Sequence, residues 1–197
     1  MKDTRFYALI SRMKFIARWS LMRNSVTENI QEHSHMVAVI AHALGVIGNR
    51  IYGKNYNPEH LATVAMFHDA TEILTGDMPT PIKYQNPDII NAYHQVEAYA
   101  ADKLLHMIPE ALREDYEALL NPDSHNGEEY RLVKAADKIS ALIKCVEERQ
   151  AGNTEFASAE RSTRQSILAM ELPEANYFME HFMPAFELDL DELGVGE

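Results

Sequence analysis

Cysteine is nearly absent from this 197-residue chain, which contains only Cys145. A lone cysteine cannot form an intramolecular disulfide, so disulfide-stapled secreted domains are excluded and a reducing compartment is indicated. Cys145 lies in the apolar run 139–146, where we expect a packed thiol rather than a nucleophile. No apolar stretch has the pattern of a signal peptide or a membrane span. We therefore expect a cytoplasmic protein with no membrane partner.

Basic residues are also scarce, with 18 Lys and Arg against 30 Asp and Glu and a formal net charge of −12. Nucleic-acid binding needs many contacts from Lys and Arg to phosphate, so we expect no nucleic-acid polymer as a partner. The first 24 residues are an exception, because they hold six basic side chains and one acidic one. Arg18 lies among them and suits a small anionic substrate. For Lys2, Arg5 and Lys14 a solvated helix face is preferred.

Strand-like alternation and internal repeats are missing, and helical patterns cover most of the chain. We predict an all-α protein of roughly seven to ten helices that forms a single domain over residues 1–197. The expected elements are a helix at 6–19, a helix ending near 51, a helix from 57 that carries His68, Asp69 and Glu72, helices at 87–108, 110–119 and 128–150, and shorter helices within 153–170 and 173–186. The acidic tail 187–197 is expected to be partly disordered.

Two local signals refine this pattern. Ser25 followed by Glu28 fits a capping box and predicts the start of the second helix, which would put His33 in the second or third turn. Residues 75–81 contain Gly76 and two prolines. They predict a loop, because Gly permits positive φ and Pro disfavours helix.

Four side chains of metal-binding type stand out: His33, the adjacent pair His68 and Asp69, and Asp137. Their wide spacing means that three separate helices must bring them to one point. Imidazole and carboxylate ligands together favour a divalent transition metal such as Mn, Fe, Co, Ni or Zn. Four protein ligands leave a position for water only on a five- or six-coordinate ion, which indicates a hydrolase with a metal-bound water.

Glu72 follows His68 by four positions and Asp69 by three, so a continuous helix would place all three on one face. The surrounding run is apolar. Polar groups inside such a run are expected to be paired or coordinating, since an unpaired buried carboxylate is costly.

The pattern of His, His-Asp and Asp resembles that of the HD-domain metal-dependent phosphohydrolases. Further segments resemble the bacterial 5'-deoxynucleotidases of the YfbR type over essentially the whole chain: 18–19, 28–34, 67–72 and 74–83. The resemblance implies an HD-domain helical bundle with a core at about 28–145 and an N-terminal helix, 5–19, that contributes to the site. It also implies a homodimer.

The resemblance implies metal-dependent hydrolysis of deoxyribonucleoside 5'-monophosphates to deoxyribonucleoside and phosphate. The four residues named above would hold the metal, and Co, Mn, Zn and Cu are all compatible. Arg18 would clamp the phosphate and act in catalysis. Glu72 would face the metal without binding it and would move protons.

Further substrate contacts follow from the same resemblance. Trp19 would form a wall of the sugar pocket and disfavour a 2'-hydroxyl, and Asp77 would accept a hydrogen bond from the 3'-hydroxyl. Core packing for Trp19 and a turn role for Asp77 remain alternatives. The implied substrate contacts are Arg18, Trp19, His33, Asp69, Asp77, Met78, Pro79, Thr80 and Asp137.

Two other activities remain open at this stage. An HD phosphodiesterase or deoxynucleoside triphosphohydrolase is one alternative, but three phosphates should need more cations than Arg18 with Lys83 and Arg23 as extras. A non-catalytic, nucleotide-sensing HD module is the other.

Three local alternatives remain open as well. Asp137 could pair with Lys134 or Lys138 instead of binding metal. His94 could add a ligand for a second ion. Glu72 could belong to an exposed polar face.

Overall fold

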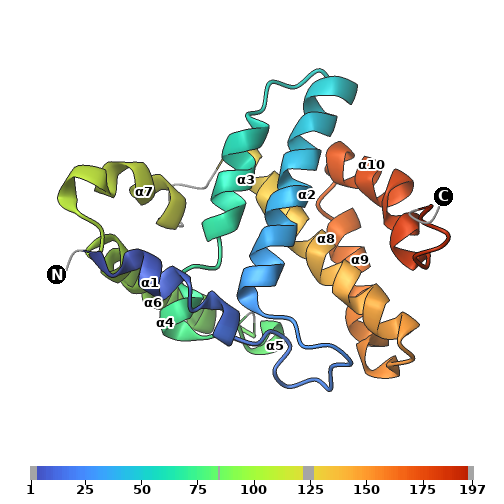
Figure 1. The fold of residues 1–197 in the computed structure, drawn as a ribbon, viewed down its shortest axis with the longest axis horizontal. Helices are drawn as coiled ribbons and strands as arrows, with labels where there is room; N and C mark the ends of the chain where they lie inside the picture. Colours follow the sequence, from blue (N-terminus) through green and yellow to red (C-terminus); the bar gives the residue numbers. More distant parts are fainter. Residues whose placement is uncertain (1–3, 84, 122–126, 195–197) are drawn as a thin grey trace.

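Helices form every regular element in residues 4–83, 85–121 and 127–194, the parts of the chain described by this computed structural model (Figure 1). The α-helices are α1 (Phe6–Ile10), α2 (Ile30–Ile51), α3 (Pro58–Phe67), α4 (Glu72–Thr75), α5 (Thr80–Lys83), α6 (Pro87–Leu105), α7 (Arg113–Leu120), α8 (Glu128–Gln150), α9 (Ala157–Leu168) and α10 (Pro173–His181). Short 3-10 helices lie at Met13–Phe15, Glu110–Leu112, Thr154–Phe156 and Met183–Glu187. The only β-type contact in these parts is a single bridge between Ala17 and Asn29. The predicted all-α class is confirmed.

The main hydrophobic core lies where α2, α3 and α8 pack together, with α9 packed on α8 and α10 packed on α2, α8 and α9 (Figure 1). The apolar stripe expected on α2 is buried in this core: Val37, Ile40, Ala41, Leu44 and Ile47. α8 contributes a stripe at the same helical spacing between Leu132 and Val146. Each fully buried Leu or Ile side chain contributes about 1.5–3 kcal/mol, so this packing fixes the relative positions of the two helices.

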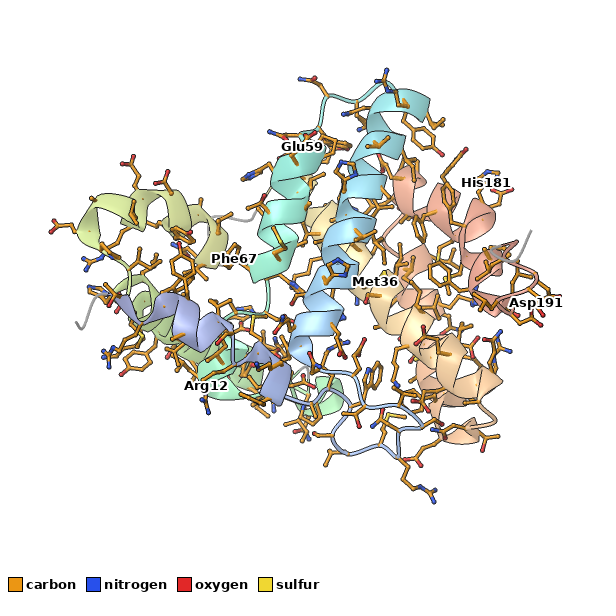
Figure 2. All side chains as sticks on the ribbon, viewed as in Figure 1. Arg12, Met36, Glu59, Phe67, His181 and Asp191 are labelled. Atoms are coloured by element: carbon orange, nitrogen blue, oxygen red, sulfur yellow. The ribbon has the colours of Figure 1, made fainter. Side chains whose placement is uncertain are left out.

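A second, smaller core joins α1, α6 and α7. Phe67, the last residue of α3, is labelled in Figure 2. Its ring stacks on that of Phe6 with ring centroids 6.3 Å apart. Ala70 is fully buried in the same cluster. The segment that follows α3 is therefore held between the two cores.

The predicted N-terminal helix 6–19 is wrong beyond α1. A 3-10 helix at Met13–Phe15 follows, and the backbone is extended at Ile16. The Arg18 N–H then donates to the carbonyl oxygen of Glu28 at 3.0 Å. The Ile30 N–H likewise donates to the carbonyl oxygen of Ile16 at 3.0 Å. These bonds tie the residues before α2 to the start of α2.

The start of α2 is also different from the prediction. Asn29 is the N-cap, and its side-chain oxygen accepts a hydrogen bond from the Glu32 N–H at 3.0 Å. The capping box at Ser25 and Glu28 is therefore wrong, because Asn29 satisfies the free N–H groups of the first turn. His33 consequently lies in the first turn of α2, not in the second or third.

The helix expected to carry His68, Asp69 and Glu72 together is interrupted. α3 ends at Phe67, and the imidazole Nδ1 of His68 lies 2.6 Å from the carbonyl oxygen of Ala65. Turns follow, and the Glu72 N–H donates to the Asp69 carbonyl at 3.0 Å as α4 begins. The prediction of one shared helical face is wrong, although the segment remains compact.

The loop predicted at 75–81 is confirmed for residues 76–79, where no helix is present. Gly76 ends α4 with φ of 73°, a backbone conformation that favours glycine. α4 includes Thr75 and α5 begins at Thr80, so the prediction is wrong for the first residue and for the last two. Proline is tolerated in the first turn of a helix, because the N–H groups there have no intrahelical acceptor.

The remaining helices follow the prediction closely. α8 has the predicted bounds, 128–150, whereas α6 ends at Leu105 rather than near 108. No described helix is both long and apolar enough to cross a membrane. The last three residues of the acidic tail 187–197 lie outside the described residues.

Candidate active site

The four predicted metal ligands converge from α2, from the turn that follows α3, and from α8. His33 Nε2 lies 3.1 Å from Asp137 Oδ1 and 3.7 Å from Asp69 Oδ2. His68 Nε2 lies 3.1 Å from Asp69 Oδ2. Ligand atoms around an ion at about 2.1 Å are separated by about 3.0 Å at right angles and about 3.4 Å at the tetrahedral angle. The distances therefore suit a small divalent cation.

Both histidines present Nε2 to the carboxylates because Nδ1 is engaged elsewhere. His33 Nδ1 lies 3.1 Å from the hydroxyl oxygen of Ser140, on α8 one turn after Asp137. His68 Nδ1 lies against the Ala65 carbonyl, which can only accept, so Nδ1 carries the proton. Hydrogen bonds of this kind orient metal-binding imidazoles and fix their tautomer.

An orphaned polar atom supports the same assignment. His68 Nε2 is buried and makes no hydrogen bond with the described residues, although Asp69 lies close to it. Burying a polar nitrogen without a partner is costly. The residues present thus fit a divalent transition metal, for which His33, His68 and Asp69 form a mutually close ligand group and Asp137 contacts His33.

The electrostatics keep the carboxylates charged. Burial raises the pKa of Asp69 and of Asp137, but the adjacent histidines outweigh it and hold both pKa values below the ordinary range. Burial and the nearby Arg18 lower the pKa of His33. For His68, burial is outweighed by Asp69, and the pKa is raised. Ionised carboxylates and a neutral His33 are the protonation states that bind metal.

Arg18 approaches this cluster from the segment before α2. Its guanidinium pairs with the Glu28 carboxylate at 2.6 Å and is mostly buried. Burial lowers the pKa of Arg18, but the carboxylates of Glu28, Asp137 and Asp69 raise it overall. The side chain is therefore charged and interacts electrostatically with both metal-site carboxylates.

Trp19 shares the same acid. Its indole N–H donates to Glu28 at 3.1 Å, and its ring lies 5.3 Å from that of Phe156. The backbone of Trp19 has φ of 57°, the left-handed region that residues other than glycine seldom adopt. Burial raises the pKa of Asp77, and the Trp19 backbone N–H acts against this rise. Trp19 and Asp77, both predicted for the sugar pocket, therefore lie near each other.

Glu72 is buried beside the cluster with 8% of its surface exposed. Its Oε2 atom has no hydrogen-bond partner among the described residues. Burial first, and then the charges of Asp69 and Asp77, raise its pKa to about 10. An exposed polar face is excluded for Glu72, and the residue can hold a proton at neutral pH.

Several other predicted residues can now be placed. Met78 and Pro79 are half-buried in the loop that carries Asp77, whereas the side chain of Thr80 lies outside the described residues. His94 is exposed on α6, and the described part of the chain gives it no place in the metal-binding group. Asp137 contacts His33 rather than Lys134 or Lys138.

The two extra cations considered for a triphosphate are already paired. Lys83 lies 2.9 Å from Glu97, and Arg23 lies 2.8 Å from Glu155. These ion pairs therefore disfavour a site with enough cations to bind three phosphates.

Sequence reasoning missed two contacts that shape the site. Ser140 follows Asp137 by three positions on α8, a spacing that could have identified it as a neighbour. Glu28 was assigned to a capping box, yet its carboxylate binds both Arg18 and Trp19. Its partners could not be read from spacing, because they depend on the extended segment before α2.

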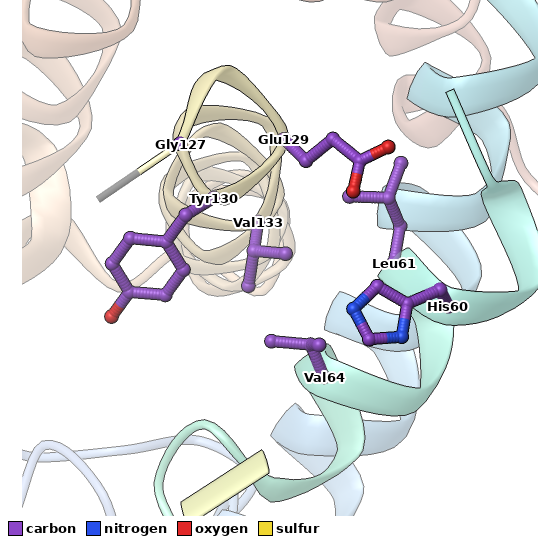
Figure 3. Close-up of a pocket in the computed structure, with 7 residues that line it drawn as sticks. All are labelled: His60, Leu61, Val64, Gly127, Glu129, Tyr130 and Val133. Carbon is purple, nitrogen blue, oxygen red and sulfur yellow. The ribbon is translucent and has the colours of Figure 1, made fainter. Parts of the chain in front are cut away.

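A small cavity of about 120 Å³ lies away from the ligands, between α3 and the start of α8 (Figure 3). It is lined by His60, Leu61, Val64, Gly127, Glu129, Tyr130 and Val133. His60 and Val64 lie one to two turns before His68. The cavity is therefore distinct from the metal-ligand cluster.

Comparison with known proteins identifies close relatives. The profile of the family described as 5'-deoxynucleotidase YfbR-like matches residues 5–186. A 5'-deoxynucleotidase of Vibrio atlanticus is 48% identical over 193 residues, covering 98% of this chain and all of the relative. The 5'-deoxynucleotidase YfbR of Shigella boydii is also 48% identical, covering 98% of this chain and 97% of the relative.

Solved structures share the fold at lower identity. An HD-domain phosphohydrolase from Listeria innocua is 23% identical, with a TM-score of 0.82 over 96% of this chain and 92% of that one. A cyanophage S-2L HD phosphohydrolase, bound to dA and one catalytic Zn²⁺ ion, is 19% identical, with a TM-score of 0.63 over 91% and 95% of the two chains. The expected HD-domain helical bundle is thereby confirmed.

Proposed function

This chain belongs to the YfbR-like 5'-deoxynucleotidase family, and we propose that it hydrolyses deoxyribonucleoside 5'-monophosphates to deoxyribonucleoside and phosphate. The observation that carries the proposal is the convergence of two imidazoles and two carboxylates with a charged Arg18 and a buried Glu72. The names of the relatives, at 48% identity over almost the whole chain, support the same activity.

A divalent metal held by His33, His68, Asp69 and Asp137 would polarise the phosphate and lower the pKa of a water. The Arg18 guanidinium binds phosphate oxygens and stabilises the charge that grows on them. Water attacks phosphorus and the bond from phosphorus to the 5' oxygen breaks. Glu72, protonated at neutral pH, gives its proton to the departing 5' oxygen and takes up the proton that the attacking water loses.

Sugar selection rests on Trp19 and Asp77. With the phosphate fixed by Arg18, the neighbouring indole is positioned to crowd a 2'-hydroxyl, and Asp77 is positioned to accept a hydrogen bond from the 3'-hydroxyl. The contacts to Glu28 and Phe156 make the Trp19 ring rigid, and a rigid wall discriminates better than one that adapts. Met78, Pro79 and Thr80 complete this side of the proposed pocket.

The native ion, the compartment and the assembly are further parts of the proposal. The His and Asp ligand set is compatible with Co, Mn, Zn or Cu. The buried thiol of Cys145 supports a cytoplasmic protein.

The assembly is argued from exposed apolar side chains: 68% of the surface of Phe15, 75% of that of Leu21 and 73% of that of Val26 are exposed. Exposed apolar side chains of this kind support a homodimer, which light scattering in solution would test.

The test of function is a substrate panel with metal-loaded protein. We expect phosphate release from dAMP and other deoxyribonucleoside 5'-monophosphates, and little release from AMP or from 3'-monophosphates. Trp19→Ala should reduce the dAMP-to-AMP ratio of kcat/KM by about 10-fold or more, because the wall is lost. Trp19→Phe is the matched control, since it keeps an aromatic wall. If wild-type protein hydrolyses AMP as fast as dAMP, the sugar-pocket assignment fails.

A further inference from the structure

Lys134 is a partly buried cation beside the proposed active site. It precedes Asp137 by three residues on α8, a spacing that places two side chains on neighbouring positions of one helical face. Its Nζ lies 5.3 Å from the centroid of the Tyr130 ring and donates a hydrogen bond to the Tyr130 side chain. Both contacts are with a neutral partner, so they hold the ammonium without cancelling its charge.

No carboxylate of the described residues lies within 4.0 Å of the Lys134 ammonium. The Lys134 ammonium still interacts electrostatically with the metal-site carboxylates. Burial lowers the pKa of Lys134, but Tyr130, Asp137 and Asp69 raise it above the ordinary value. Lys134 in turn lowers the pKa values of Asp137 and His68. Together with the three-residue spacing between Lys134 and Asp137 on α8, these effects support a Lys134 charge beside the ligand cluster.

The charges around the site leave Lys134 uncompensated. A divalent ion would neutralise the carboxylates of Asp69 and Asp137. Arg18 is already paired with Glu28 at 2.6 Å. Glu72 is buried, and its pKa is raised to about 10. Among the described residues, Lys134 has no ion-pair partner, so its charge is available to a phosphate monoester that enters as a dianion.

We propose that Lys134 binds the substrate phosphate as a second cation, from the α8 side of the site and apart from Arg18. The proposal rests on the proposed function and extends it by assigning a residue for the phosphate dianion. An ammonium offers three donors and a compact charge, which suits a phosphate oxygen. It would add to affinity for the phosphoryl group and leave the sugar and base untouched.

Lys134→Gln is the direct test, with Lys138→Gln as the control. Lys138 follows Lys134 by one helical turn on α8, and its replacement changes the net charge equally while Lys134 stays in place. The control therefore shows whether the loss of any positive charge on this side of α8 has the same effect. Binding of inorganic phosphate and of deoxyadenosine to the metal-loaded proteins is measured by calorimetry, and bound metal by elemental analysis. We expect Lys134→Gln to weaken phosphate binding by about 10- to 100-fold, the effect of losing one charge-assisted hydrogen bond. Deoxyadenosine binding and bound metal should be unchanged.

Two outcomes would overturn the proposal. Unchanged phosphate affinity would show that Lys134 does not contact phosphate, and loss of metal would assign it to the metal site instead. Lys134→Arg should recover part of the affinity, which separates a cation requirement from a packing effect. The result is distinguishable from a failure of the proposed function, because that failure would appear as wild-type protein that binds phosphate but hydrolyses no deoxynucleotide.

Discussion

At the scale of single residues, Glu72 combines a buried carboxyl group with an unpaired oxygen. Only 8% of its surface is exposed, and Oε2 has no hydrogen-bond partner among the described residues. Burial and the charges of Asp69 and Asp77 raise its pKa to about 10. A carboxyl group that holds its proton at neutral pH can act as a general acid.

Glu72→Gln should separate chemistry from binding. The amide keeps the shape of the side chain but cannot transfer a proton, so kcat should fall by about 10²- to 10⁴-fold. Metal content and dAMP affinity should stay near wild type, as measured by elemental analysis and calorimetry. The wild-type rate should also fall at alkaline pH as Glu72 loses its proton, and the variant should lack this fall. Glu32→Gln, an exposed acid on α2, is the control, and a near-normal kcat in Glu72→Gln would rule out proton transfer by Glu72.

At the scale of elements, a buried ion pair on α8 holds the connection that leads into α2. Glu148 accepts hydrogen bonds from the Ser25 N–H at 2.8 Å and from the Asn153 side chain at 2.7 Å. Lys144 pairs with Glu148 and donates to the carbonyl oxygen of Val26. These contacts attach the segment that follows Trp19 to the helix that carries the metal-site aspartate.

Glu148→Gln should reduce the free energy of unfolding by about 3–5 kcal/mol, because it leaves Lys144 buried without its partner. Burial raises the pKa of Glu148, but the contacts with Lys144, Ser25 and Asn153 lower it to about 2, from an ordinary 4.5. A lowered carboxyl pKa contributes stability that is present above pH 4.5 and is lost as pH falls toward 2. The difference between wild type and variant should therefore shrink over that range.

Urea unfolding at a series of pH values measures this effect. Glu147→Gln, a change at an exposed neighbour on the same helix, should leave the free energy of unfolding almost unchanged. A difference between wild type and Glu148→Gln that stays constant from pH 7 to pH 2 would show that the pair does not titrate as described.

The elements differ in how far their sequences predicted them. The bounds of α8 were predicted correctly, because its apolar stripe and its polar ends both indicate the same helix. The start of α2 was predicted wrongly. Glu28 has the spacing of a capping box, but its carboxylate binds Arg18 and Trp19 instead. The end of α3 was missed because the His68 imidazole occupies the Ala65 carbonyl, which a continuing helix would need. Both failures arise from side-chain contacts that local propensity does not contain.

At the scale of the whole molecule, the site is assembled from the segment before α2 and from α2, the end of α3 and α8. The candidate metal ligands could be predicted, because imidazole and carboxylate groups together are typical ligands of divalent transition metals. The contact of Ser140 with His33, and those of Glu28 with Arg18 and Trp19, could not be predicted, since they depend on which side chains face each other after folding. The net charge of −12 is a sum over the whole chain, so it does not indicate that cations lie near the site where a phosphate would bind.

The central claim is that the convergent histidines and aspartates hold a metal on which phosphate release from deoxynucleotides depends. The most direct measurement is phosphate release from dAMP by protein stripped of metal, verified as metal-free, and then supplied with Mn or Co. We predict no turnover in the stripped protein, recovery when metal is added, and no recovery in Asp137→Ala. Undiminished hydrolysis of dAMP by verified metal-free protein would contradict the account.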